Sequence, residues 1–281
     1  AKKINGTIIN ADSMQIYSNL KIITARPSEK DNQMIKHELY GYIDGSIRYN
    51  VANWCKDIVK IINKNEKKNK PSIIVGGTGM YINSLLNGLI DMPSISEIYK
   101  KKSEKLLNEI GLSSFVENIL EFDPASLKQI SRNDLTRLRR IWEVYQSTGK
   151  TYSKWKEEKN INFLKNKPIS INLFLPSKEK IYNNINNRFK KMIKNGAIEE
   201  VENLNYLNLE KSLPIMRAHG VPEISDYLEN KLSLEGCIEK SQQVTRNYAK
   251  RQLTWWRSST LIGMQVFTQL PNEIDENMIK I

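Results

Sequence analysis

The segment IINADSMQIY, residues 8–17, decides the fold of this chain. It begins with two β-branched apolar residues, Ile8 and Ile9, and then passes into the turn-forming sequence NADS at positions 10–13. This pattern predicts a short buried strand that ends just before the carboxylate of Asp12. In an open α/β sheet, ligands bind beyond the carboxyl ends of the strands. Asp12 is therefore a candidate functional residue, although its position alone favours a simpler role as the cap of a following helix.

A second strand, followed by a glycine turn, is predicted at residues 71–89. The sequence SIIV at 72–75 predicts a buried strand, GGTG at 76–79 a turn, and residues 80–89 a helix. Such a turn can direct backbone N–H groups at an anion. It matches neither a Walker A loop nor the dinucleotide fingerprint, so a tight structural turn is the better interpretation of the pattern alone. Thr78 is the one side chain in the turn that can hydrogen-bond a substrate.

The bulk composition limits the class of protein. The chain has 281 residues, 40% of them hydrophobic, which is enough for one large core or for two domains. No apolar run approaches the ~18 residues of a membrane span, and the first residues do not resemble a signal peptide. With two cysteines and two histidines, neither a disulfide framework nor a zinc site is indicated, and a reducing cytoplasm fits. The net charge of +12 weakly favours polyanionic partners.

Residues 93–167 differ from the segments on either side because they are charged and are predicted to be helical throughout. Asn133 or Asp134 can cap a helix that runs to about Ser147, and Gly149 ends it. The helix carries four arginines within nine positions, a density that modestly favours phosphate contacts over plain solvated surface. We therefore predict a helical insertion at 93–167, between core segments 1–92 and 168–281.

The last strong element is a helix over residues 234–257, after a strand predicted at 169–175 and helices at 178–195 and 197–207. At 100° per residue, Arg246, Lys250 and Arg257 share one face of this helix. Tyr248 and Trp255 share the opposite face. A basic stripe backed by aromatic residues suits a helix that docks on a core and lies along a phosphate backbone. The pattern fits a solvated amphipathic helix equally well.

Taken together, these segments resemble bacterial tRNA dimethylallyltransferases, also called tRNA isopentenyltransferases. Six segments match in family order and cover nearly the whole chain, and although each is weak by itself, six in register are specific. They are INADSMQIY (9–17), TARP (24–27), VGGTGMYINSLL (75–86), NDLTRLRRIWEVYQSTGK (133–150), MRAHGVPE (216–223) and TRNYAKRQLTWWR (245–257).

The resemblance implies an α/β fold with a P-loop NTPase-like parallel-sheet core and an inserted all-helical subdomain. It implies the transfer of a dimethylallyl group from dimethylallyl diphosphate to N6 of the adenosine 3′-adjacent to the anticodon, in tRNAs that read codons beginning with U. The diphosphate is expected to travel with Mg²⁺, which offsets its charge. The implied partner is the tRNA anticodon stem-loop, and we expect a cytoplasmic monomer.

The resemblance also assigns roles residue by residue. Asp12 matches the family's general base, which accepts the N6 proton as the C–N bond forms. Thr78 matches a threonine that hydrogen-bonds the reacting amine or the diphosphate. Arg26 and Arg217 are candidate diphosphate contacts. The predicted tRNA contacts are Asp12, Ser13, Met14, Gln15, Lys100, Thr136, Arg137, Leu138, Arg139, Arg140, Arg217, Ala218, His219, Gly220, Arg246, Lys250, Arg251 and Gln252.

Two features depart from the family pattern. Val221-Pro222 stands where many members have Tyr-Arg, which leaves Arg217 or Arg26 to supply a cation to the diphosphate. The family's glycine-rich phosphate loop would precede Ala1 and is absent from this sequence. Because neither Asp12 nor Thr78 can replace that loop, we expect this chain to bind tRNA but not to transfer a prenyl group by itself.

Three other functions remain open at this point. An adenylate isopentenyltransferase shares the core but has no need of the helical insertion or of the basic stripe at 246–257. A catalytically inactive RNA-binding remnant would fit the absent phosphate loop. A small-molecule kinase of the P-loop class is the weakest alternative, because no Walker A sequence is present.

Overall fold

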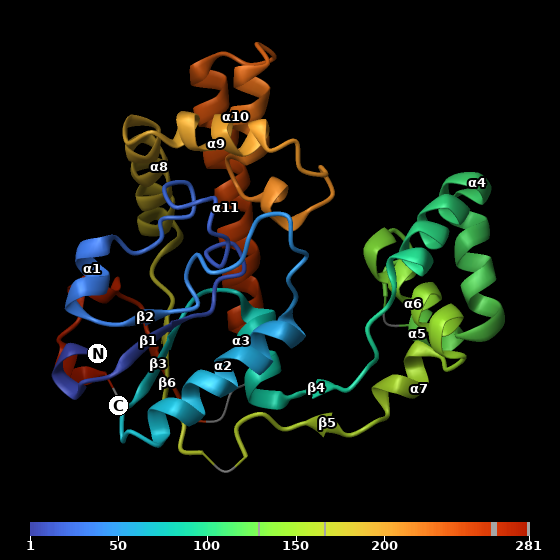
Figure 1. Cartoon of the computed structure of the whole chain (residues 1–281), viewed down its shortest axis with the longest axis horizontal. Helices are drawn as coiled ribbons and strands as arrows, with labels where there is room; N and C mark the ends of the chain where they lie inside the picture. Colours follow the sequence, from blue (N-terminus) through green and yellow to red (C-terminus); the bar gives the residue numbers. More distant parts are fainter. Residues whose placement is uncertain (129, 166, 260–262, 280–281) are drawn as a thin grey trace. The chain divides into compact units, whose positions relative to one another are not determined.

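The computed structural model describes residues 1–128, 130–165, 167–259 and 263–279 (Figure 1). The chain divides into two compact units. One unit comprises residues 1–86 and 163–281, and the other comprises residues 87–162, which are inserted between them in sequence.

The first unit is built on a three-stranded parallel sheet. β1 (Thr7–Asn10) lies in the middle, between β2 (His37–Glu38) and β3 (Ser72–Val75). The register pairs Asn10 with Val75, so β1 and β3 end at the same level. The turns that follow the two strands therefore leave the same edge of the sheet. The strands predicted at residues 8–9 and 72–75 are confirmed.

A second parallel pair completes the β-structure of this unit. β6 (Ile171–Phe174) pairs with β7 (Met264–Phe267), and the stacked rings of Phe174 and Phe267 lie 5.2 Å apart at the end of the ladder. The sequence predicts β6 but not β7, because a four-residue segment that includes Gln265 lacks a clear apolar alternation. The parallel pairing in both sheets confirms the expected α/β class.

Helices pack around these sheets. α2 shows why the sequence folds as it does: Asn50 caps its first turn, and Trp54, Ile58 and Ile62 recur on its buried face. This recurrence of apolar residues is typical of an amphipathic helix. The helices of the unit are α1 (Glu29–Met34), α2 (Val51–Glu66), α3 (Gly79–Asn87), α8 (Lys178–Lys194), α9 (Ala197–Tyr206), α10 (Val221–Leu228) and α11 (Leu234–Ser258), with short 3₁₀ turns η1 (Lys2–Ile4), η2 (Pro214–Arg217), η3 (Pro271–Glu273) and η4 (Glu276–Met278).

The long helix α11 connects two parts of this unit (Figure 1). Near its start it packs on α8 and α10, around a core that includes Ile16, Leu20, Phe189 and Ile224. Nearer its end it reaches the turn between β3 and α3, where a Cβ atom on Gly79 would lie 2.4 Å from the Trp255 ring. The apolar face predicted for this helix is the face that docks.

The glycine turn at residues 76–79 lets neighbouring segments of the chain pack closely against its backbone. A Cβ atom on Gly76 would lie 2.4 Å from the backbone of Ala11, and one on Gly77 would lie 2.4 Å from the Gln252 side chain. The backbone N–H of Thr78 points at the carbonyl oxygen of Ala11, 3.4 Å away. The turn therefore joins β1, β3 and α11, as the structural interpretation of the glycines predicts.

The inserted unit has its own core. α4 (Glu97–Phe122), interrupted at Gly111 (φ 76°), packs against α6 (Leu135–Thr148) through Phe115, Ile119, Leu138 and Trp142. Asp134 caps α6 and Gly149 ends it with φ 68°, as predicted. The remaining elements are α5 (Pro124–Leu127), α7 (Tyr152–Lys156), β4 (Leu89–Ile90) and β5 (Asn160–Ile161).

The insertion is not wholly helical, which corrects the expectation in one detail. Its first and last residues run antiparallel and form the short ladder β4–β5. Gly88, with φ +83°, allows this approach, because a Cβ atom there would lie 2.4 Å from the carbonyl oxygen of Ile161. In the described part of the chain, no helix is both long and apolar enough to cross a membrane.

Replacing Gly76 by Ala tests the contact between the glycine turn and β1. The new methyl group meets the Ala11 backbone, which cannot move without disturbing the strand. We expect the free energy of unfolding to fall by about 1–3 kcal/mol, measured by urea denaturation.

Gly236→Ala in the first turn of α11 is the matched control. The nearest atom to its new Cβ is the Ser233 hydroxyl, at 3.4 Å. We expect this variant to equal or exceed wild type in stability, because alanine is the better helix former. Equal stability of the two variants would contradict the close packing at Gly76.

Candidate active site

The carboxylate of Asp12 organises the turn that follows β1. Its Oδ1 atom accepts hydrogen bonds from the backbone N–H groups of Met14 (2.8 Å) and Gln15 (3.3 Å). Residues 13–16 form a turn rather than a helix, so the predicted cap acts on a turn. In the described part of the chain, the Oδ2 atom has no hydrogen bond. One oxygen is therefore fixed by the backbone and the other is available to a ligand.

Thr78 meets this turn from the neighbouring strand. Its Oγ1 atom accepts a hydrogen bond from the backbone N–H of Ser13 at 3.2 Å, across 65 residues of sequence. The two residues predicted to be catalytic, Asp12 and Thr78, thus lie on adjoining turns at the carboxyl ends of β1 and β3.

Helix α11 contributes a third group, Tyr248. Its hydroxyl group lies near the side chains of Thr78 and Gln252, which both lower its pKa against the effect of burial. Gln252 donates to the carbonyl oxygen of Gly77 at 2.8 Å. The ring of His219 meets the Tyr248 ring edge-on, with 4.7 Å between centroids. The Arg251 guanidinium lies 5.5 Å from the same ring. Tyr248 is therefore the centre of a small aromatic and polar cluster beside Thr78.

The charge of Asp12 reaches side chains from several elements. Burial and then the Asp12 charge raise the pKa of Tyr40 to about 12, and the same two causes raise the pKa of Tyr248. Arg188 on α8 is exposed, yet desolvation by the surrounding protein lowers the pKa of its guanidinium, and the Asp12 charge opposes that shift. Asp12 therefore shares its surroundings with a cation and with several hydroxyl groups.

The sequence analysis missed Arg188 and Tyr40. Arg188 stands alone in the polar segment NNRFKK at 186–191, where an arginine normally marks a solvated helix face. The fold brings α8 near enough to the β1 turn for the Asp12 charge to act on Arg188. Tyr40 follows a strand of two residues, too short to be detected by alternation of apolar residues.

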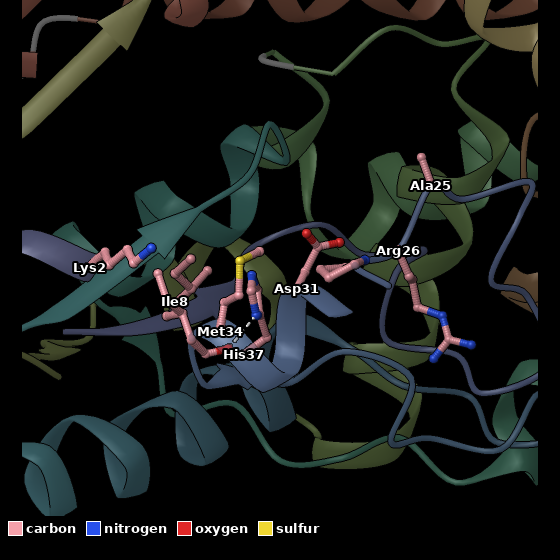
Figure 2. A pocket seen from close by; sticks show the side chains of 9 residues that line it. Lys2, Ile8, Ala25, Arg26, Asp31, Met34 and His37 are labelled. Carbon is pink, nitrogen blue, oxygen red and sulfur yellow. Dashed lines mark hydrogen bonds between the residues drawn. The ribbon is translucent and has the colours of Figure 1, made fainter. Parts of the chain in front are cut away.

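Arg26 lies apart from this cluster. It lines a surface cavity of about 440 Å³ beside α1, together with Lys2, Asp31, Met34 and His37, and its guanidinium points away from the other labelled side chains (Figure 2). One of its terminal nitrogens donates to the carbonyl oxygen of Ser18 at 2.9 Å, and desolvation lowers its pKa. Asp12 does not line the pocket that Arg26 lines.

Three of the predicted tRNA contacts are buried in this structure. Leu138 is 0% exposed within the core of the insertion, Ala218 is 2% exposed, and Gly220 is buried against Ile23. Their burial favours structural roles for these three positions.

Two predicted phosphate contacts are held by internal partners. Arg139 donates from Nε to Ser103 (3.0 Å) and from a terminal nitrogen to the carbonyl oxygen of Lys100 (2.8 Å). Arg246 donates to Asn186 and Gln243, each at 2.7 Å. These bonds favour structural roles for both arginines.

The other predicted cations differ in exposure. Arg140 is half-buried, with its pKa lowered chiefly by desolvation, while Arg137 is 68% exposed beside Asp134 and Lys100 is paired with Glu97 at 2.6 Å. Thr136 is exposed, and so are Arg217, Lys250 and Arg251.

Comparison with known proteins identifies relatives of this chain. The family model described as IPP transferase matches residues 15–259. A tRNA dimethylallyltransferase of Ehrlichia ruminantium (strain Welgevonden) is 41% identical over 262 residues, which cover 92% of this chain and 85% of that protein. A tRNA dimethylallyltransferase of Wolbachia sp. subsp. Drosophila simulans (strain wRi) is 40% identical over 257 residues, which cover 92% of this chain and 86% of that protein.

Solved structures agree with these relatives. The full-length tRNA isopentenylpyrophosphate transferase of Bacillus halodurans superposes with a TM-score of 0.66 at 26% identity, covering 99% of this chain and 85% of that one. A eukaryotic dimethylallyltransferase acting on tRNA gives a TM-score of 0.75 at 28% identity, covering 91% of this chain and 64% of that one.

The titration of His219 tests the electrostatics of the cluster. Burial lowers the pKa of its ring below 6.5, and the charges of Arg251 and Arg188 act in the same direction, against Glu223 and Asp12. Between the lowered pKa and 6.5 the unfolded chain binds more protons, so stability should fall as the pH drops through that window. We expect the ring resonances to titrate below 6.5 by NMR.

His219→Gln should remove this part of the pH dependence of stability. Because the chain has two histidines, the His37→Gln variant assigns the two ring signals. A midpoint at or above 6.5 for His219 would contradict the described surroundings of the ring.

Proposed function

The chain belongs to the IPP transferase family, and from this premise we propose that it transfers a dimethylallyl group from dimethylallyl diphosphate to tRNA. The acceptor is N6 of the adenosine on the 3′ side of the anticodon, in tRNAs that read codons beginning with U. The proposal rests on one observation. The turns that carry Asp12 and Thr78 are hydrogen-bonded to each other at the carboxyl ends of two parallel strands. We further propose that the protein acts in the cytoplasm as a monomer.

Asp12 supplies what the reaction most needs, a proton acceptor. The lone pair of an adenine N6 is delocalised into the ring, so the amine is a poor nucleophile until its proton is removed as the C–N bond forms. The Oδ1 atom of Asp12 is fixed by two backbone amides, which leaves Oδ2 to face the amine. A target base must leave its stack to reach such a site.

Thr78 orients the acceptor. Its oxygen accepts a hydrogen bond from the Ser13 amide, and Tyr248 lies near it, so the side chain is held at the Asp12 turn. A fixed hydroxyl at this place can position the amine or a diphosphate oxygen in line with the bond that breaks.

Arg188 and Arg217 are the diphosphate contacts that the structure supports best. Arg188 shares the surroundings of Asp12, and a guanidinium binds phosphate oxygens in a bidentate manner. Arg217 is exposed beside His219 in sequence. Arg26, the other predicted contact, is bound to Ser18 in a separate pocket.

In the proposed reaction, Mg²⁺ arrives bound to the diphosphate substrate. Within the described ranges, no three His, Cys, Asp or Glu side chains converge as metal ligands. Mg²⁺ commonly binds through substrate phosphates and keeps several waters, so we treat it as the counterion of the diphosphate and assign it no step.

The exposed cations of the first unit suit the tRNA backbone. Lys250, Arg251 and Arg257 lie on α11, and Lys190 and Lys191 lie on the neighbouring helix α8. Such contacts position RNA without reading its sequence. A free nucleotide would use few of them, which argues against an adenylate isopentenyltransferase.

The assignment of Asp12 is tested by Asp12→Asn in the natural full-length protein. Asparagine keeps the two hydrogen bonds to the turn but does not accept a proton. We expect the single-turnover rate of dimethylallyl transfer to fall by roughly 10²–10⁴, with little change in tRNA affinity.

Asp44→Asn is the matched control for this variant. Asp44 closes a similar turn by accepting from the backbone N–H of Ser46 at 2.9 Å, on exposed surface. The single-turnover rate of dimethylallyl transfer by Asp44→Asn should equal that of wild type. Near-normal transfer by Asp12→Asn would show that Asp12 is only a turn cap.

The tRNA surface is tested by Lys250→Ala. Loss of one phosphate contact should reduce the slope of log K against log salt by about one, for unrelated tRNAs alike. Arg246→Ala should instead lower the free energy of unfolding by about 1 kcal/mol, because it removes the bonds to Asn186 and Gln243. An unchanged slope for Lys250→Ala would place that face of α11 in plain solvent.

A further inference from the structure

The side-chain amide of Asn10 is fully engaged around the backbone of Asp12. Asn10 is 0% exposed at the end of β1. Its Oδ1 atom accepts from the Asp12 N–H at 2.8 Å, and its Nδ2 atom donates to the Asp12 carbonyl oxygen at 2.9 Å. Both polar groups of one residue's backbone are thus held by a single side chain.

The second hydrogen of the same amide reaches another segment. Nδ2 donates to the carbonyl oxygen of Leu39 at 3.0 Å. Leu39 is buried with φ +63°, a left-handed conformation that is strained for a leucine and persists only when its surroundings enforce it. Beside it, the Gly41 N–H donates to the Gln15 carbonyl oxygen at 2.8 Å. The segment 39–41 is therefore bound to the Asp12 turn at two points.

The backbone of Asn10 is anchored in turn by a buried tryptophan. Its carbonyl oxygen accepts from Trp54 Nε1 at 2.8 Å, and the fully buried Trp54 ring packs on Tyr81 with 4.8 Å between centroids. Helix α2 thus anchors the residue that holds the Asp12 turn.

We propose that Asn10 is a positioning residue, whose amide clamps the Asp12 turn and the strained segment at Leu39 so that the Asp12 carboxylate faces the reacting amine. This inference rests on the proposed function. The amide is the group that fits, because it accepts once and donates twice. Aspartate has no donors when ionised, and a serine hydroxyl donates only once.

Asn65 provides a matched control. It is also a buried asparagine of the first unit, 7% exposed, on α2. Its amide bonds Ser72 (2.9 Å) and accepts from Thr7 (3.5 Å), at the start of β1 rather than at its end. Asn65→Ser and Asn10→Ser therefore both lose buried hydrogen bonds, but only Asn10→Ser loosens the Asp12 turn.

The experiment measures transfer to an anticodon stem-loop together with amide hydrogen exchange. For Asn10→Ser we expect kcat to fall by roughly ten- to a hundredfold, with KM for the RNA within about twofold of wild type. Exchange should accelerate at residues 12–15 and 39–41. Asn65→Ser should leave both kcat and the exchange of those segments unchanged.

A milder variant keeps the test decisive if Asn10→Ser does not fold. Trp54→Phe retains an aromatic ring but removes the N–H that anchors Asn10, together with part of the buried indole, so kcat should fall by about threefold to tenfold. Wild-type kcat in Trp54→Phe and Asn10→Ser, or equal losses in Asn65→Ser, would overturn the proposal. If the wild-type protein transfers no dimethylallyl group, the proposed function fails, and the exchange pattern alone decides whether the clamp exists.

Discussion

The parallel pairing of β1 with β3 is the constraint on which the site depends. Because the two strands end in register, their following turns leave the sheet together, and Gly76 brings the second turn against the Ala11 backbone. A side chain at position 76 would separate the turns and with them Asp12 and Thr78. The short apolar runs near residues 8 and 73 thus have a consequence for chemistry, since their pairing places a carboxylate beside a hydroxyl group.

Helix α11 joins this site to the surface. Its inner face carries Tyr248, Gln252 and Trp255, which bond or pack against the glycine turn, while Lys250 on another face is exposed. A rigid helix with both sets of side chains fixes the distance between a bound phosphate backbone and the reacting groups. That arrangement explains why the turn needs glycines at two positions, where Gln252 and Trp255 leave no room for a Cβ atom.

Sequence reasoning was most successful where a single element carries the information. The strands β1 and β3, helix α2 and the caps of α6 follow from apolar periodicity and turn residues. The roles of the arginines were harder to predict, because whether a guanidinium group is free to bind RNA depends on partners that lie far along the chain. Arg139 is held by Ser103 and Arg246 by Asn186, while Arg188 is close enough to Asp12 for the two charges to interact. No local pattern distinguishes these three situations.

The charge balance around Asp12 bears on how a diphosphate is received. Burial raises the pKa of Tyr40 and Tyr248 and lowers the pKa of His219. Arg251 lies beside Tyr248 in the same cluster. Arg188 is the cation that Asp12 influences most directly there, and the two charges offset each other. The diphosphate of the proposed reaction carries several negative charges, and Arg188, already offset by Asp12, and Arg217 would neutralise only part of them. We therefore propose that the substrate brings cations with it or meets further backbone donors, and we treat Mg²⁺ as part of the substrate.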